Sequence, residues 1–184
     1  MSLKTQLKYI PIEDYLEGEE LSDIKHEYID GQVYAMVGAS RRHNRIALDF
    51  ASALTNHLRG SPCKAYISDM KVRIDNVFYY PDMVIACHAG GHDYYETEPV
   101  VIVEVLSPST ESKDRLEKRL TYQRLASLQE YVLVAQDKVQ VDIYRRTAEG
   151  WELEQCDERD VLRLDALDFT LPVLDIYRDA MNII

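Results

Sequence analysis

The stretch Val100-Val101-Ile102-Val103-Glu104-Val105-Leu106 decides the fold of this chain. A continuous run of branched apolar residues is typical of a β-strand that is buried on both faces of a sheet. Glu104 interrupts the run, and an ionised carboxylate that is buried without a partner costs several kcal/mol. We therefore expect Glu104 to be matched by a cation, a metal ion or a proton.

The flanking residues place Glu104 near one end of this strand. Pro99 precedes the run, and Ser107-Pro108-Ser109-Thr110 follows it and offers hydroxyl groups suited to capping a helix. The order predicts a central strand with Glu104 near its carboxyl end. In open sheets covered by helices, binding sites tend to open at that end.

Length and composition predict one domain over residues 1–184, with 46% hydrophobic and 29% charged residues. The first residues lack the apolar run of a signal peptide, and no apolar stretch approaches the roughly 20 residues of a membrane helix. We expect a soluble, cytoplasmic protein with no membrane contact. Cys63, Cys87 and Cys156 lie far apart, so we expect them to be reduced and structural.

A formal net charge of −11 argues against a protein that coats nucleic acid non-specifically. Two local basic clusters offset this acidity and leave two interpretations open, a basic cleft or solvated helix faces. The clusters are Arg41, Arg42, His43 and Arg45, and Lys113, Arg115, Lys118, Arg119 and Arg124.

The dipeptide Asp30-Gly31 predicts a β-hairpin between residues 26–29 and 32–36. This hairpin places Glu27 on a largely apolar face, together with Ile29, Tyr34 and Met36. Glu27 is therefore either an edge carboxylate that reaches solvent or a second acid at a site. A short helix over residues 9–22 precedes the hairpin.

Apolar residues at helical spacing predict an amphipathic helix over residues 42–58, ended by Gly60 and Pro62. His43 projects from its first turn on or near the buried stripe. It is either a packing histidine or a functional one.

Two strands are expected around Asp75-Asn76, over residues 65–74 and 79–86. Pro81 indicates an edge, a bulge or a bend in the second strand. Such a bend can redirect the next side chain, which is Asp82.

A helix over residues 112–128 is expected after the central strand. Its inward positions are predicted to be Leu116, Leu120, Leu125 and Leu128. Asp114 and Lys118 are spaced i,i+4 and could form a surface ion pair. The remaining expected elements are strands at 131–135, 139–145, 151–153 and 161–164, and a helix over 174–181. A metal site in the loop 87–93 is disfavoured because paired glycines prevent a helix there.

Asp82 and Glu104 lie on separate elements that could pair within one mixed sheet. Two neighbouring carboxylates repel unless one is protonated or a divalent cation bridges them. Oxygen ligands of this kind suit Mg²⁺, with Mn²⁺ as a substitute. Such an ion could activate a water molecule and neutralise a phosphodiester, while a nearby lysine stabilises the developing negative charge.

An ordered set of residues and motifs runs along the chain: Tyr80-Pro81-Asp82, EVLSPST at residues 104–110, Asp114, Lys118, Tyr122, and EYVLV at residues 130–134. This set resembles the pattern of the Uma family of restriction-endonuclease-like proteins. This family is a branch of the PD-(D/E)XK nuclease superfamily. The resemblance runs from the Asp30-Gly31 hairpin nearly to the C-terminus. It implies an α/β fold with a restriction-endonuclease-like mixed β-sheet core flanked by helices and an N-terminal β-hairpin.

The chain departs from the superfamily pattern at Leu106, where a lysine is expected two residues after the acid. In the Uma branch, the corresponding lysine is Lys118 on the following helix. The resemblance therefore implies Asp82, Glu104 and the Val105 carbonyl as ligands of Mg²⁺. Lys118 would stabilise charge, and Glu27 and His43 would be accessory residues at the catalytic site.

The resemblance implies a Mg²⁺-dependent endonuclease that hydrolyses phosphodiester bonds in DNA as a homodimer. Two alternatives stay open. One is a non-catalytic nucleic-acid-binding or regulatory module in which a buried Lys118 neutralises Glu104. The other is a structural dimer whose interface is built from the 13 tyrosines.

Overall fold

The computed structural model describes residues 8–88, 90–108 and 110–182, so the capping expected of Ser109 and the N-terminal residues 1–7 lie outside the described residues. Strand β8 (Val101–Leu106) lies in the middle of a six-stranded sheet, and its six residues are all buried. The strand order is β11-β10-β9-β8-β6-β3, where β8 runs parallel to β9 and antiparallel to β6. The bounds of the other strands are β3 Lys64–Ile67, β6 Met83–Ala86, β9 Glu130–Ala135, β10 Gln140–Thr147 and β11 Gly150–Asp157.

A second sheet of five strands, in the order β2-β1-β5-β4-β7, carries the predicted hairpin at one edge. Both turn residues have positive φ, 45° at Asp30 and 89° at Gly31, as expected for this dipeptide. The strand bounds are β1 His26–Ile29, β2 Gln32–Ala35, β4 Lys71–Ile74, β5 Val77–Tyr79 and β7 Tyr95–Glu96.

The single strand expected over residues 65–74 is wrong. The chain leaves the six-stranded sheet after β3 and enters the five-stranded sheet as β4. Asp69, between the two strands, has a φ of 116°, which breaks the extended run. A second break, at Pro81, separates β5 from β6 as the proline predicted.

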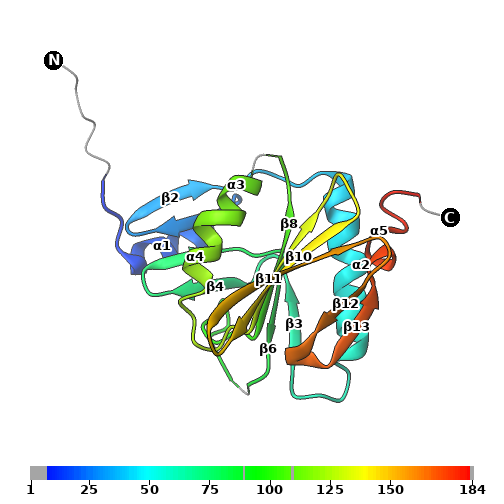
Figure 1. Cartoon of the computed structure of the whole chain (residues 1–184). Helices are drawn as coiled ribbons and strands as arrows, with labels where there is room; N and C mark the ends of the chain where they lie inside the picture. Colours follow the sequence, from blue (N-terminus) through cyan, green and yellow to red (C-terminus); the bar gives the residue numbers. More distant parts are fainter. Residues whose placement is uncertain (1–7, 89, 109, 183–184) are drawn as a thin grey trace.

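Apolar side chains cover both faces of the six-stranded sheet, which explains the unbroken pattern of β8. On one face, Val101, Val103 and Val105 pack with helices α2 (Arg41–His57) and α5 (Val173–Tyr177) and with the β12–β13 hairpin (Figure 1). On the other face, Ile102 and Leu106 pack with residues of the five-stranded sheet. Glu104 lies between Ile102 and Leu106 on this second face, because every second residue of a strand points to the same side.

Three smaller elements complete the fold. Helix α1 (Ile12–Leu21) packs Tyr15 against Tyr28 and Phe78 of the five-stranded sheet. Strands β12 (Val161–Leu164) and β13 (Phe169–Pro172) pair with each other, with the 3-10 turn η2 (Asp165–Leu167) between them. Within the described part of the chain, no helix is long and apolar enough to cross a membrane.

The helix expected over residues 112–128 ends at Tyr122 and turns its leucines outward, whereas Leu128, beyond its end, is buried as predicted. The helix consists of α3 (Glu111–Lys113), a π-helical turn η1 (Asp114–Lys118) and α4 (Arg119–Tyr122). Leu116 and Leu120 are 59% and 52% exposed, so their prediction as inward residues is wrong. Asp114, Lys118 and Tyr122, each four residues apart, are buried instead. Apolar spacing failed here because the inward face meets the polar side chains of a site.

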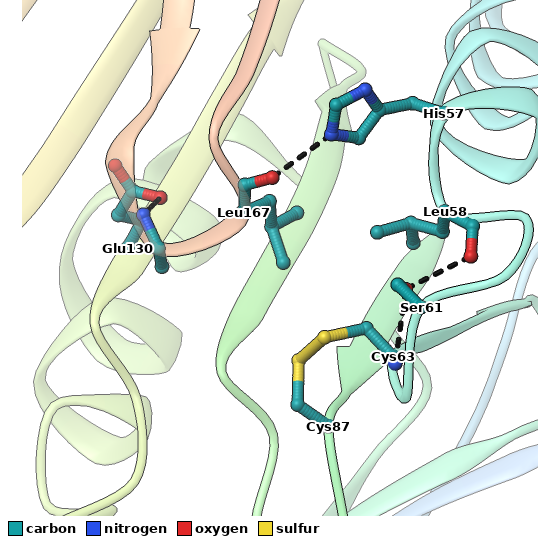
Figure 2. The surroundings of a disulfide bond; sticks show 8 residues. His57, Leu58, Ser61, Cys63, Cys87, Glu130 and Leu167 are labelled. Carbon is teal, nitrogen blue, oxygen red and sulfur yellow. Dashed lines mark hydrogen bonds between the residues drawn. A yellow bond between two sulfur atoms is a disulfide. The ribbon is translucent and has the colours of Figure 1, made fainter.

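Cys63 and Cys87 form a disulfide bond, which corrects the expectation that all three cysteines are reduced (Figure 2). Lys64 pairs with Ala86 in the β3–β6 ladder, so Cys63 and Cys87 face each other one position beyond it. Their separation of 24 residues gave no hint of this register. Cys156 is a free, buried thiol.

We predict one titratable thiol per chain when the protein is denatured without reductant, and three after reduction. Cys63→Ser should also lower the free energy of unfolding by about 2 to 4 kcal/mol, because the disulfide constrains the unfolded chain. Thiol titration and urea denaturation measure these values. Three thiols without reductant would contradict the disulfide.

We also predict that Leu120→Gln changes the free energy of unfolding by less than about 0.5 kcal/mol, because its side chain faces solvent. Leu128 is fully buried, so Leu128→Ala should cost about 2 to 5 kcal/mol. Urea denaturation of both variants measures the difference. An equal loss for the two variants would mean that the helix has the orientation expected from its leucines.

Candidate active site

A cleft of about 740 Å³ opens beside the carboxyl end of β8. It lies between the β1–β2 hairpin, the first turn of α2, the start of β6, and the segment α3–η1. The residues predicted from the sequence that line this cleft are Glu27, His43, Asp82, Glu104, Val105 and Lys118. Side chains separated by up to 91 positions in the chain (Glu27 to Lys118) thus meet in one place.

Asp82 and Glu104 are brought together by strand register. Met83 pairs with Val103 in the antiparallel β6–β8 ladder, so Asp82 faces Glu104 one position beyond it. The Val105 amide donates a hydrogen bond of 2.7 Å to Asp82 Oδ2, which holds the aspartate at this strand end. The bend at Pro81 therefore directs Asp82 towards the residue after Glu104.

Lys118 lies at the centre of a group of three carboxylates. Its Nζ is 3.0 Å from Glu104 Oε1, 3.0 Å from Glu27 Oε1 and 3.4 Å from Asp114 Oδ1. The Lys118 and Asp114 side chains are 5% and 2% exposed, so the predicted surface ion pair is a buried one. The Tyr122 hydroxyl donates a further hydrogen bond of 3.2 Å to Glu104 Oε1.

Glu27 joins two lysines, and the alternative of a solvent-exposed edge carboxylate is wrong. Its residue is 6% exposed. One carboxylate oxygen lies 2.6 Å from Lys113 Nζ, and the other is the contact to Lys118. The hairpin predicted from Asp30-Gly31 thus brings an acid from the N-terminal region to the helix after β8.

Burial and charge act against each other on the pKa values of these groups. Burial would lower the pKa of Lys118, but Glu104, Glu27 and Asp114 raise it well above its usual value, so the ammonium stays charged. Burial, reinforced by Asp114 and Asp82, raises the pKa of Glu104 despite Lys118. Burial would also raise the pKa of Glu27, but Lys118 and Lys113 lower it.

His43 contacts Asp82 from the first turn of α2. Its Nε2 lies 3.2 Å from Asp82 Oδ2. Burial would lower the pKa of His43, but the hydrogen bond and the charge of Asp82 outweigh burial and raise it, with a further contribution from a hydrogen bond to the Val105 backbone. His43 therefore belongs to the cleft rather than to the apolar stripe of α2.

Sequence patterns did not single out Lys113, Tyr79 or the inward position of Asp114. Lys113 and Asp114 line the cleft, and the Tyr79 ring lies 5.4 Å from Lys118 Nζ. The spacing of four between Asp114, Lys118 and Tyr122 was a usable signal, because it puts all three on one helical face. The spacing of the leucines favoured a different inward face of this helix.

Most other members of the two basic clusters are paired away from the cleft. Arg45 pairs with Asp49 and Asp179, Arg115 with Glu111 and Asp142, and Arg124 with Asp75. Arg119 lies over the Tyr144 ring. Among residues 8–88, 90–108 and 110–182, no group of three or more His, Cys, Asp or Glu side chains could hold a metal ion.

We predict that Lys118→Met lowers the free energy of unfolding by about 3 to 5 kcal/mol, because it leaves three buried carboxylates without their shared cation. Glu104→Gln should cost less, about 1 to 3 kcal/mol, because Lys118 keeps two carboxylate partners. Urea denaturation without metal measures both. Lys138→Met, in an exposed lysine between β9 and β10, is the control and should change nothing. Equal losses for Lys118→Met and Glu104→Gln would contradict the shared arrangement.

The sequence of this chain is similar to a known family and to two other proteins. The model of the family described as "Uma2: Putative restriction endonuclease" matches residues 12–174. The uncharacterized protein slr1290 of Synechocystis sp. is 38% identical over 171 residues, which cover 90% of each chain. A second uncharacterized Synechocystis protein, sll1609, is 31% identical over 155 residues, covering 81% of this chain and 88% of its own.

The fold is also similar to a solved structure. The crystal structure described as that of a putative nuclease belonging to DUF820, from Anabaena variabilis, superposes with a TM-score of 0.77 at 17% identity, covering 93% of this chain and all of the other. Its likeness confirms the expected mixed α/β, nuclease-type fold. Together with the family match over residues 12–174, it leads to one conclusion: the chain belongs to the Uma2 family of putative restriction endonucleases.

Proposed function

We propose that this protein is a Mg²⁺-dependent endonuclease that hydrolyses phosphodiester bonds in DNA. The observation that carries the proposal is the position of Asp82 opposite Glu104 at the end of the central strand, with Lys118 Nζ 3.0 Å from Glu104. Carboxylates facing each other beside a cationic side chain are suited to a hydrolytic site for a phosphate ester. Family membership supports the same class of reaction.

Two carboxylates, those of Asp82 and Glu104, and the Val105 carbonyl are the oxygen donors that would be available to a hard divalent cation. Five carboxylates and three lysines line the cleft: Asp23, Glu27, Asp82, Glu104 and Asp114, with Lys25, Lys113 and Lys118. The negative charge therefore exceeds the lysine charge, and oxygen ligands suit Mg²⁺ or Mn²⁺. Asp82, Glu104 and the Val105 carbonyl would hold the ion, which would lower the pKa of a water molecule and neutralise charge on the phosphate.

Lys118, His43 and Glu27 would have separate roles in the reaction. Lys118 takes the place of the lysine that is absent at Leu106, and its ammonium stabilises the negative charge that develops on the phosphate. Leu106 itself is 4% exposed and packs in the core. His43 orients Asp82, and Glu27 orients Lys118. Cleavage of both strands of a duplex would require two such sites, so a homodimer is part of the proposal.

Cleavage of supercoiled plasmid DNA with Mg²⁺ or Mn²⁺ tests this function. The wild type should cut, and Asp82→Asn, Glu104→Gln and Lys118→Met should each lose at least about 100-fold in rate, because each removes a charged group at the reacting phosphate. Removal of the metal by a chelator should abolish cleavage. Glu152→Gln, in an exposed glutamate of β11, is the matched control and should keep the wild-type rate.

Calorimetric titration of Mn²⁺ separates the metal site from the unknown substrate. Binding to the wild type should disappear in Glu104→Gln and persist in Glu152→Gln. Binding that persists in Glu104→Gln, or cleavage that survives in Asp82→Asn, would contradict the proposed site.

The ion pair between Glu104 and Lys118 gives a second candidate function some support. A non-catalytic module that binds nucleic acid could use Lys118 permanently in place of a metal ion. This alternative predicts that the wild type binds a DNA duplex but neither binds Mn²⁺ nor cleaves. A dimer built on tyrosines is less supported, because seven of the 13 tyrosines are buried within the chain.

A further inference from the structure

Two lysines share the carboxylate of Glu27, but their surroundings differ. The Lys118 side chain is 5% exposed and has carboxylates on three sides. The Lys113 side chain is 29% exposed, and within the described part of the chain its ion pair is with Glu27. Lys118 is therefore neutralised inside the site, whereas Lys113 keeps one side of its ammonium towards solvent.

Aromatic rings hold Lys113 at the cleft without removing its charge. Its Nζ lies 5.3 Å from the centre of the Tyr79 ring and 5.7 Å from that of Tyr34. Tyr34 lines the cleft and is 48% exposed, so this contact lies at the solvent-facing side. A cation over an aromatic face is attracted to it but stays available to an anion.

The acidity of the cleft makes such a cation necessary for a nucleic-acid substrate. A phosphate backbone that approaches Asp82 and Glu104 also meets the negative charges of Glu27 and Asp114. Phosphate binding depends on lysine and arginine side chains that neutralise this repulsion. The third lysine of the cleft, Lys25, is 44% exposed and pairs with Asp69 outside this carboxylate group.

We propose that Lys113 is a substrate-binding residue that contacts a phosphate of the nucleic-acid backbone beside the one that is cleaved. Glu27 is its positioning residue, because it holds the ammonium at the cleft through one oxygen and fixes Lys118 through the other. Both lysines are thereby aligned by one carboxylate from the hairpin. This inference rests on the proposed nucleic-acid substrate but does not require hydrolysis.

Affinity for a fluorescent 20-base-pair DNA duplex, measured over a series of salt concentrations with Ca²⁺ in place of Mg²⁺, tests this role. Loss of one phosphate contact should make the slope of log K against log salt less steep by about 0.9 in Lys113→Met. Lys113→Arg should keep the wild-type slope, because it keeps the charge. Lys64→Met, in an exposed lysine of β3 that does not line the cleft, should also keep it.

Calorimetry with Mn²⁺ and a thermal melt accompany these measurements. Lys113→Met should bind Mn²⁺ like the wild type and should lose less stability than Lys118→Met, because Glu27 keeps Lys118 as a partner. In the cleavage assay, Lys113→Met should raise KM and leave kcat nearly unchanged. A wild-type slope and KM in Lys113→Met would overturn the role of Lys113 while leaving the nuclease proposal intact. A changed slope in a protein that does not cleave DNA would support Lys113 and refute the nuclease. A wild type that binds no DNA would overturn both.

Discussion

The burial of Glu104 in the central strand is the constraint on which the site depends. A carboxylate in the middle of a six-stranded sheet must be neutralised, and the chain supplies Lys118 for this purpose. The buried ammonium of Lys118 has three N–H donors, and Glu27 and Asp114 also lie close to it, at 3.0 and 3.4 Å. Each group is tolerated only because the others are present.

This mutual dependence explains the shape of the elements around the cleft. The helix after β8 turns its leucines to solvent so that Asp114, Lys118 and Tyr122 can face the sheet. A π-helical turn occupies residues 114–118, where the acid and the lysine lie, and π-helical turns occur frequently at functional sites. The β1–β2 hairpin contributes Glu27 to the cleft, and its strand β1 pairs with β5 and packs Tyr28 against Tyr15 of α1.

The same contacts give the cleft its chemical character. Charged groups of both signs lie close together at the end of the central strand, and shifted pKa values such as those of Glu104 and Lys118 are frequent at functional sites. The acidic groups that line the cleft outnumber its lysines. Under the proposed function, a polyanionic substrate would need both a metal ion and the solvent-facing Lys113 to offset this negative charge.

Sequence alone determined the central strand, the hairpin and helix α2, because a continuous apolar run, turn residues and helical spacing are local signals. The resemblance to the Uma family added the set Glu27, His43, Asp82, Glu104 and Lys118, whereas Lys113 and the inward position of Asp114 were missed. Tertiary structure decided the rest. Register set Cys63 against Cys87 and Asp82 against Glu104, and only the polar site could override the leucine pattern of the helix. Local patterns carry no information about which distant strands pair or which charges meet, because these depend on the three-dimensional path of the whole chain.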